Sequence, residues 1–234
     1  MFLKLNSQTR NIHKALRDLI RKKDPIIVEV GSHLGTDTRR LREGFPEAKI
    51  YCFEPDPRAH NVLEKYCSDL EFDLVKYAVS DTDAEDVAFY QAYSDKNIDA
   101  MLEKYSWIEK NDFINFRLNR CGASSIKKGH EAVAHGTEIK VKTIKIDTWA
   151  RRNGIEYIDL LWVDVQGAEK EVFCGARESL KKIKIIWTEY GETDYEGGMS
   201  RSETIQMLKA YFSVMNHFSI FHKKGNLLFK NKFI

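Results

Sequence analysis

Short apolar runs separated by segments of helical periodicity recur along this 234-residue chain, and this alternation constrains its fold more than any other feature. The apolar runs predict strands over residues 26–30, 50–53, 72–79, 158–164 and 183–189. Helical spacing of apolar residues between these runs predicts helices over 36–43, 57–67 and 168–180. Strands joined by helices form βαβ units with right-handed crossovers. We therefore expect an α/β fold with a doubly wound, mostly parallel sheet and helices on both faces.

The two ends of the chain depart from this alternation. Residues 1–25 hold apolar side chains at helical spacing with basic residues between them, and Pro25 ends the pattern. This predicts an N-terminal amphipathic helix, which either packs on the domain, as we favour, or lies on a membrane surface. At the other end, residues 214–222 and 227–229 predict two strands joined by a Gly-Asn turn. We expect an antiparallel hairpin there.

We expect residues 26–234 to form one domain, because no linker or internal repeat divides them. Residues 80–157 form a polar, irregular insertion within it, with strands predicted only over 86–90 and 138–146. An aromatic stretch in this insertion either packs in a core, as we favour, or stacks on a sugar; it holds Tyr105, Trp107, Phe113 and Phe116. We expect the insertion to face an acceptor substrate.

Composition excludes several classes of protein. A net charge of +2, from 37 basic and 35 acidic residues, gives no reason to expect a nucleic-acid partner. No apolar run reaches the roughly 18–20 residues of a membrane helix, and the N-terminus lacks the apolar core of a secretory signal. The four cysteines have neither C-x-x-C nor zinc-site spacing, which is typical of reduced thiols. We expect a cytoplasmic protein without stable membrane insertion.

The turn after the first strand indicates a cofactor site. Gly31 and Gly35 enclose Ser32 in "EVGSHLG", which lacks the third glycine of the dinucleotide fingerprint and the lysine of a phosphate-binding loop. Glu29, two residues before Gly31, would repel a pyrophosphate but accept a hydrogen bond from an ammonium group. This favours S-adenosyl-L-methionine, with Glu29, Gly31, Ser32 and Gly35 at its methionine end.

The ends of the next two strands support the same cofactor. Glu54 lies 23 residues after Gly31, where a carboxylate can accept hydrogen bonds from both hydroxyls of a ribose. Val79 and Ser80 end the third predicted strand and are expected to border the adenine, and Asp81 to accept from its amino group. The sequence thus predicts a complete set of contacts to S-adenosyl-L-methionine.

These segments, together with later ones, resemble the FkbM-type family of S-adenosylmethionine-dependent methyltransferases. The similarity spans residues 28–190 and rests on "VEVGSHLGTDT", "CFEPDP", "YAVSD", "CGASSI", "VKTIKIDTWARRNGIEYIDLLWVDVQGAEKEVFCGARESL" and "IIWTEY". The family's signature segment falls on Asp164, Gly167, Ala168 and Glu169. Departures from the family pattern stand at Ser32, His33 and Gln166. The resemblance implies a class I methyltransferase fold, Rossmann-like with seven strands and a final antiparallel hairpin, and O-methylation, often of a sugar hydroxyl in a glycan or glycosylated metabolite.

Catalysis of this reaction needs a group that removes a proton from the acceptor hydroxyl. Asp164 and Glu189 end neighbouring predicted strands, where they can act as base and orienting group, or as ligands of Mg²⁺ or another divalent metal. His130 in "SIKKGH" is a further candidate base. The loop "ETDYEGG" after the fifth of these strands is expected to contact a small-molecule or oligosaccharide acceptor.

Two alternatives from other classes remain open at the level of sequence. One is an NAD-dependent sugar-modifying oxidoreductase, which the missing third glycine disfavours. The other is a non-catalytic binding module of the same fold.

Overall fold

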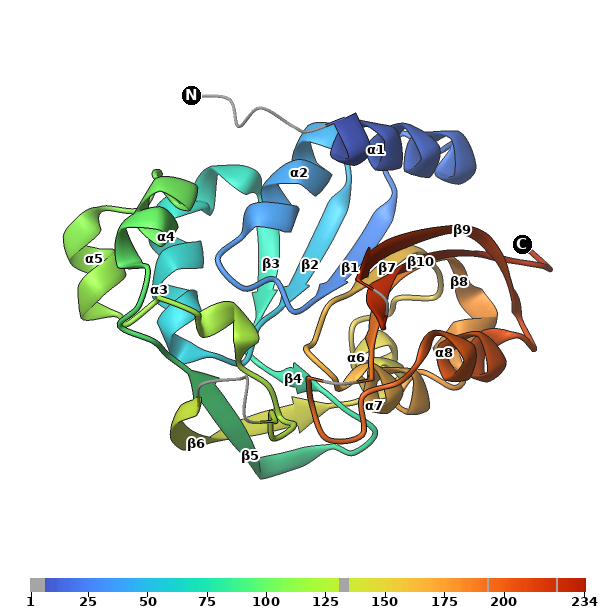
Figure 1. The fold of residues 1–234 in the computed structure, drawn as a ribbon. Coiled ribbons are helices and arrows are strands. Elements are labelled where there is room, and N and C mark those ends of the chain that lie inside the picture. The colour runs from blue at the N-terminus through green and yellow to red at the C-terminus, as the bar shows by residue number, and fades with distance from the viewer. Residues whose placement is uncertain (1–6, 131–134, 193, 222) are drawn as a thin grey trace.

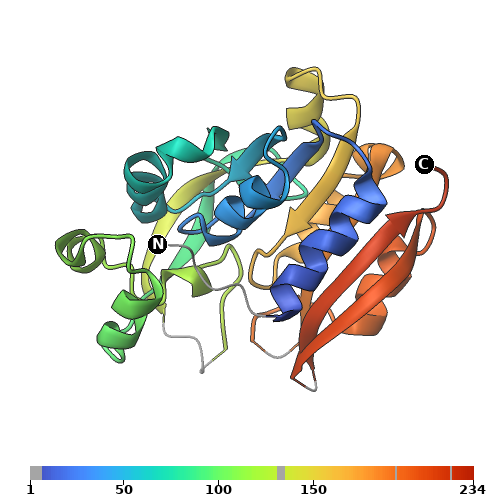
Figure 2. The ribbon, with the colours of Figure 1, turned by 90° about the horizontal axis from the view of Figure 1, so that it is seen from above.

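The computed structural model describes residues 7–130, 135–192, 194–221 and 223–234. Its centre is a seven-stranded sheet with the strand order β3-β2-β1-β7-β8-β10-β9. Five strands run parallel, namely β1 (Ile26–Val30), β2 (Lys49–Phe53), β3 (Phe72–Val75), β7 (Ile158–Val163) and β8 (Ile183–Gly191). The last two, β9 (Phe212–Phe221) and β10 (Lys224–Asn231), form an antiparallel hairpin at one edge, opposite α4 and α5 (Figure 2). The predicted mostly parallel sheet with a C-terminal hairpin is confirmed. The Gly-Asn turn predicted to join the hairpin strands is wrong, because Gly225 and Asn226 lie within β10 and pair with β9.

Helices cover both faces of this sheet (Figure 1). On one face lie α1 (Ser7–Ile20) and α2 (Thr36–Gly44), whose buried side chains share a core with Trp162 and Trp187 of the sheet. On the other face lie α6 (Ile146–Arg152), α7 (Glu169–Cys174) and α8 (Arg201–Leu208). The apolar stripe of α1 is buried in the first core, so this helix is packed on the domain.

Strand order reverses at β1, because the chain builds β2 and β3 on one side of β1 and later adds β7 on the other. In open α/β sheets this switch point, at the carboxyl ends of the strands, is where ligands bind. The topology therefore places the ends of β1 and β7 at the centre of any ligand site.

A second, three-stranded sheet lies beside the first and has the order β4-β6-β5. Its strands are β4 (Ala78–Val79), β5 (Ala84–Ala92) and β6 (His135–Ile144). The single strand predicted over 72–79 is wrong, because the chain turns where Tyr77 N donates to Val75 O, and then pairs with β6 instead of β2. The apolar pattern continues across this turn, so periodicity alone does not locate it.

The insertion is more helical than predicted. It contains α4 (Ile98–Lys104) and α5 (Lys110–Asn115). An earlier helix, α3 (Pro57–Tyr66), follows β2. Tyr105 and Phe113 pack in a separate core with residues of α3, as the favoured interpretation of the aromatic stretch expects. Among the described residues, no helix is long and apolar enough to cross a membrane.

The helix predicted over 168–180 is also too long. It ends at Cys174 because Gly175 packs against the carbonyl of Ser80, where a Cβ would lie 2.0 Å from the oxygen. A short 3-10 helix, Ser179–Lys182, completes the segment. This contact fixes the end of β4 against the end of α7 and so anchors the second sheet.

Candidate functional site

The turn after β1 lies directly against the end of β7. Gly31 has a φ of +91°, and a Cβ at this position would lie 1.9 Å from the carbonyl oxygen of Asp164. Gly35 has a φ of +81° and immediately precedes α2. Only glycine permits both the left-handed backbone and the close approach at Gly31. The two strand ends that the topology selects are therefore in contact.

Glu54 connects the end of β2 to this turn. Its Oε1 accepts from Asp56 N at 2.8 Å, and its Oε2 accepts from His33 N at 2.7 Å. The side chain is buried, and burial is the main cause that raises the pKa of Glu54 to about 8. Two backbone hydrogen bonds thus fix the carboxyl group with a lone pair left on each oxygen.

Glu29 lies deeper, within β1, and is fully buried. Its Oε2 accepts from Thr38 Oγ1 at 2.7 Å and from Cys52 Sγ at 3.2 Å. Its Oε1 has no hydrogen-bond partner within the described chain. Burial raises the pKa of Glu29 to about 8. Glu29 lines neither of the two pockets described next, so its predicted contact to a ligand ammonium stays a prediction.

Two pockets open at the switch point and meet there. The inner pocket has a volume of about 520 Å³, part of it open to solvent, and is bordered by Gly31, Glu54, Val79 and Asp164 among others. The outer pocket, about 1450 Å³ including open solvent, extends over the start of α2 toward α4. The residues that line both are Gly31, His33, Gly122 and Asp164.

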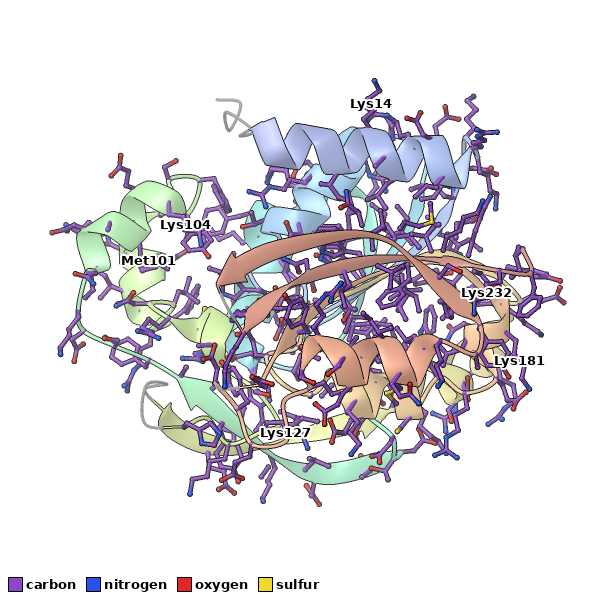
Figure 3. All side chains as sticks on the ribbon, turned by 45° about the vertical axis from the view of Figure 1, so that its right-hand side comes forward. Lys14, Met101, Lys104, Lys127, Lys181 and Lys232 are labelled. Atoms are coloured by element: carbon purple, nitrogen blue, oxygen red, sulfur yellow. The ribbon has the colours of Figure 1, made fainter. Side chains whose placement is uncertain are left out.

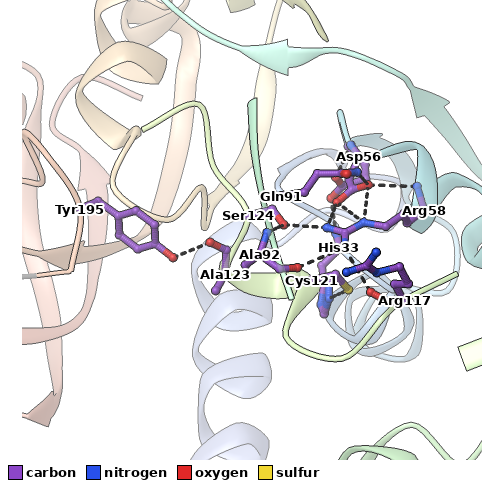
Figure 4. Close-up of polar contacts among 11 residues, drawn as sticks. His33, Asp56, Arg58, Gln91, Ala92, Arg117, Cys121, Ala123, Ser124 and Tyr195 are labelled. Carbon is purple, nitrogen blue, oxygen red and sulfur yellow. Dashed lines mark hydrogen bonds and ion pairs between the residues drawn. The ribbon is translucent and has the colours of Figure 1, made fainter. Parts of the chain in front are cut away.

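His33 lines both pockets. Its backbone is left-handed, with a φ of +51°, and its Nε2 lies 2.9 Å from Cys121 Sγ (Figure 4). The ring meets Tyr105 edge-on at 5.8 Å between centroids. Burial, followed by the charge of Lys104, lowers the pKa of His33 to about 4. The imidazole is therefore neutral at physiological pH and forms an uncharged part of the lining of both pockets.

The candidate catalytic carboxyls, Asp164 and Glu189, come together at the ends of β7 and β8. Gln166 Nε2 donates to Asp164 Oδ1 at 2.5 Å and to Glu189 Oε2 at 3.2 Å. Burial raises the pKa of Asp164, and burial together with the charge of Asp164 raises the pKa of Glu189. A hydrogen bond between the carboxyls raises the pKa of Glu189 further and lowers that of Asp164. Asp164 is thus the carboxyl that ionises first.

Two further side chains hold this pair in place. The Tyr195 hydroxyl lies 3.2 Å from Gln166 Oε1 and donates to Ala123 O at 2.8 Å (Figure 4). Lys224 Nζ lies 3.3 Å from Glu189 Oε1 and 3.3 Å from Asp194 Oδ2. The predicted acceptor loop around Tyr195 therefore reaches the carboxylate pair.

The other predicted site residues lie at different distances from the pockets. Ser32 is buried and lines the outer pocket, and Val79 lines the inner one. Ser80 is buried and Asp81 exposed, and neither lines a pocket. The side chain of His130 is exposed and lies outside both pockets. The predicted contacts of Ser80, Asp81 and His130 therefore stay predictions.

The main chain of His130 does connect two predicted loops. His130 N donates to Asp194 O at 2.9 Å, and Glu196 N donates to Lys128 O at the same distance. The "SIKKGH" and "ETDYEGG" segments therefore lie side by side at the rim of the site.

Several pocket residues were not predicted from the sequence. Tyr77 and Phe89 line the inner pocket, together with Ser124, Ser125 and Ile126. The last three belong to the "CGASSI" segment, which was identified by resemblance without a role. Within the described part of the chain, no group of three or more His, Cys, Asp or Glu residues is arranged to hold a metal ion.

Comparison with known proteins agrees with this geometry. The Methyltransferase FkbM domain matches residues 29–215. The 2-O-methyltransferase NoeI of Sinorhizobium fredii is 31% identical over 206 residues, which cover 86% of this chain and 77% of that protein. The methyltransferase sdnD of Sordaria araneosa is 26% identical over 171 residues, which cover 66% and 61% of the two chains.

Solved structures give the fold. The fibrillarin/Nop5p complex superposes with a TM-score of 0.50 at 10% identity, over 90% of this chain and 74% of that one. With the domain match over most of the chain and the identity to NoeI, the conclusion is direct: this chain belongs to the FkbM methyltransferase family and is an S-adenosylmethionine-dependent methyltransferase with a class I fold.

Proposed function

We propose that this enzyme transfers the methyl group to a hydroxyl oxygen of a sugar in a small-molecule or oligosaccharide acceptor. The observation that carries the proposal is the position of Asp164, which lines both pockets and is joined to Glu189 through the amide of Gln166. A weakly acidic hydroxyl needs such a base, whereas a more nucleophilic acceptor does not. The name of the similar 2-O-methyltransferase supports transfer to oxygen.

The residues of the site fit S-adenosyl-L-methionine. Glu54 keeps free lone pairs for two ribose hydroxyls, and Tyr77, Val79 and Phe89 supply apolar walls for a base. At the other end, Thr36 Oγ1 and Arg40 Nε on α2 are buried without hydrogen-bond partners among the residues that the structure describes. Buried polar atoms without partners are rare in proteins, and these two match a carboxylate of the methionine end. When bound, the cofactor supplies an electrophilic methyl group.

The chain itself has to place the acceptor oxygen and remove its proton. The acceptor enters through the outer pocket, whose lining includes Asp164. Asp164 takes the hydroxyl proton as the acceptor oxygen attacks. Glu189 stays protonated and donates a hydrogen bond to Asp164. Gln166 keeps both carboxyls in position through its single amide group. Alignment of the acceptor oxygen with the methyl group within one site supplies the rest of the acceleration.

A methyl-transfer screen tests this function. Radiolabelled S-adenosylmethionine is incubated with the enzyme and a panel of mono- and oligosaccharides, with and without EDTA, and labelled product is separated and counted. We expect an O-methylated sugar. Loss of transfer in EDTA that added Mg²⁺ restores would assign Asp164 and Glu189 to a metal instead of to proton transfer. Binding of S-adenosylhomocysteine in calorimetry without transfer to any sugar would favour the binding-module alternative.

Calorimetry also tests the remaining oxidoreductase alternative. We expect S-adenosylhomocysteine to bind and NAD to give no heat, because Glu29 and the two-glycine turn do not suit a pyrophosphate.

A further inference from the structure

More positive charges line the outer pocket than are balanced by nearby acidic side chains. Four cations line it, of which Arg40 forms an ion pair with Asp37 at 2.8 Å. The other three, Lys96, Lys104 and Arg120, are exposed at its rim and make no salt bridge with any described residue. Their charges are therefore available to a ligand.

The charge balance inside this pocket is also positive. The four cations face two carboxyl groups, those of Asp37 and Asp164, which leaves 4 − 2 = +2. His33 adds no charge, because burial keeps its imidazole neutral. An excess of unpaired positive charge in a concave site attracts anions from solution.

The wall that carries two of these cations is rigidly tied together. Asn119 is buried, and its Nδ2 donates to the carbonyls of Ser94 and Lys96. Arg58 donates to the carbonyls of Ala92 and Arg117, each at 3.1 Å (Figure 4). The segments before Lys96 and before Arg120 are thus fixed to each other, which lowers the entropy lost when a ligand binds between them.

Asn119 also offers an acceptor to a ligand hydroxyl. Asn119 is only 2% exposed, and its Oδ1 has no hydrogen-bond partner among the described residues. Met101 and Lys104 of α4 (Figure 3) also line this pocket and give it one apolar and one cationic side chain. Cations, an acceptor oxygen and a small apolar surface together match an anionic sugar.

We infer that the acceptor carries a carboxylate or phosphate group, which binds among Lys96, Lys104 and Arg120 while a sugar hydroxyl of the same molecule reaches Asp164. This inference rests on the proposed function. The same oxyanion chemistry has a second source, the carboxylate of the cofactor itself. Its experiment must therefore separate acceptor binding from cofactor binding.

Matched acceptors provide the first arm. Glucose, galactose, mannose and N-acetylglucosamine are each compared with the corresponding uronic acid and 6-phosphate in the radiolabelled transfer assay. We expect kcat/KM for at least one anionic member to exceed that of its neutral partner by about tenfold or more. The preference should shrink at high ionic strength, because rim charges are screened by salt.

Charge-neutral variants provide the second arm. Lys96→Gln, Lys104→Gln and Arg120→Gln should each raise KM for the anionic acceptor about threefold, and the triple variant by more than about tenfold. Lys110→Gln on α5 is the matched control, since Lys110 is exposed and lines neither pocket. We expect Lys110→Gln to leave KM unchanged.

The outcomes separate the two proposals. Equal transfer to neutral and anionic sugars, unaffected by the triple variant, overturns this inference and leaves the proposed function in place. A triple variant that weakens S-adenosylhomocysteine binding in calorimetry, without a change in acceptor KM, assigns the cations to the cofactor and also overturns it. Transfer to no sugar of the panel overturns both proposals.

Discussion

At the residue scale, the chemistry depends on how one carboxyl is kept ionised beside another. Asp164 and Glu189 are both buried enough to have raised pKa values, and they share one amide donor from Gln166. The charge of Asp164 disfavours ionisation of Glu189, so one proton is retained between them. The pair therefore has one ionised carboxylate, which can take one proton from the hydroxyl of the acceptor substrate.

Asp164→Asn tests the role of the base. The amide keeps the shape of the side chain but cannot accept the proton, so we expect kcat to fall by roughly 10²–10⁴-fold. The Kd of S-adenosylhomocysteine should change little, as calorimetry will show. Asp86→Asn, at an exposed position of β5, is the control and should retain full activity. Retained methyl transfer in Asp164→Asn would remove Asp164 from the mechanism.

The pH profile offers a second test of the same residue. Because burial raises the pKa of Asp164, the base is protonated and inactive at the acid end of the range. We expect kcat/KM to rise with pH along a limb whose midpoint lies above about 3.9, the ordinary value for aspartate. A profile that stays flat down to pH 4 would contradict this assignment.

Glu54→Gln tests the cofactor contact. The glutamine amide has one oxygen that accepts hydrogen bonds, whereas both oxygens of Glu54 accept them. We therefore expect the variant to lose one backbone hydrogen bond and one ribose contact. Because the raised pKa keeps Glu54 largely neutral near pH 7, loss of the ribose hydrogen bond costs about 0.5–1.5 kcal/mol, which corresponds to a Kd for S-adenosylhomocysteine raised by roughly 2–12-fold. Glu103→Gln, exposed on α4 and outside both pockets, should bind normally.

At the element scale, α1 is part of the domain core. Ile12, Leu16 and Ile20 are buried against the same face of the sheet as Leu41 of α2. Lys14 of α1 is exposed and points away from this face (Figure 3). The helix therefore buries its apolar stripe on the sheet, and that stripe is not available to a membrane.

Leu16→Ala measures this packing. Removing a fully buried leucine side chain costs about 2–5 kcal/mol of the free energy of unfolding, because it leaves a cavity. Urea denaturation should show this loss, whereas Lys14→Ala should change stability by less than about 0.5 kcal/mol. Equal stability of the two variants would mean that α1 contributes little to the folded domain.

At the scale of the whole molecule, buried carboxyls make stability depend on pH. Burial raises the pKa of Glu29 and of Glu54 to about 8, and that of Glu169 to about 7. Their pKa values in the unfolded chain are close to 4.5. The folded state therefore binds more protons than the unfolded state between these limits.

Stability without ligand should accordingly fall as pH rises from about 5 to about 8, the interval in which only the unfolded carboxyls are ionised. Urea denaturation at several pH values measures this slope. Glu169→Gln should make the slope shallower, because it removes one of the three raised pKa values. A free energy of unfolding that does not change over this interval would contradict burial of the three groups in their present positions.

Much of this architecture could be predicted from local patterns. Apolar runs located β1, β2, β7 and β8 to within a few residues, and they also located the two hairpin strands, although Gly225 and Asn226 lie within β10 and not in the turn. The ends of β3 and α7 were wrong, since the chain turns at Tyr77 to pair with the distant β6, and Gly175 packs against the distant carbonyl of Ser80. Local periodicity does not contain such contacts.

The sequence by itself determined the sheet, the glycine turn and the acids at the strand ends, because each depends on residues only a few positions apart. Only the tertiary structure decided that His33 is a neutral part of the pocket lining, that Gln166 joins two carboxyls, and that Lys96 and Arg120 flank one pocket. These residues are brought together by loops without periodicity. Their proximity therefore follows from how the whole chain packs.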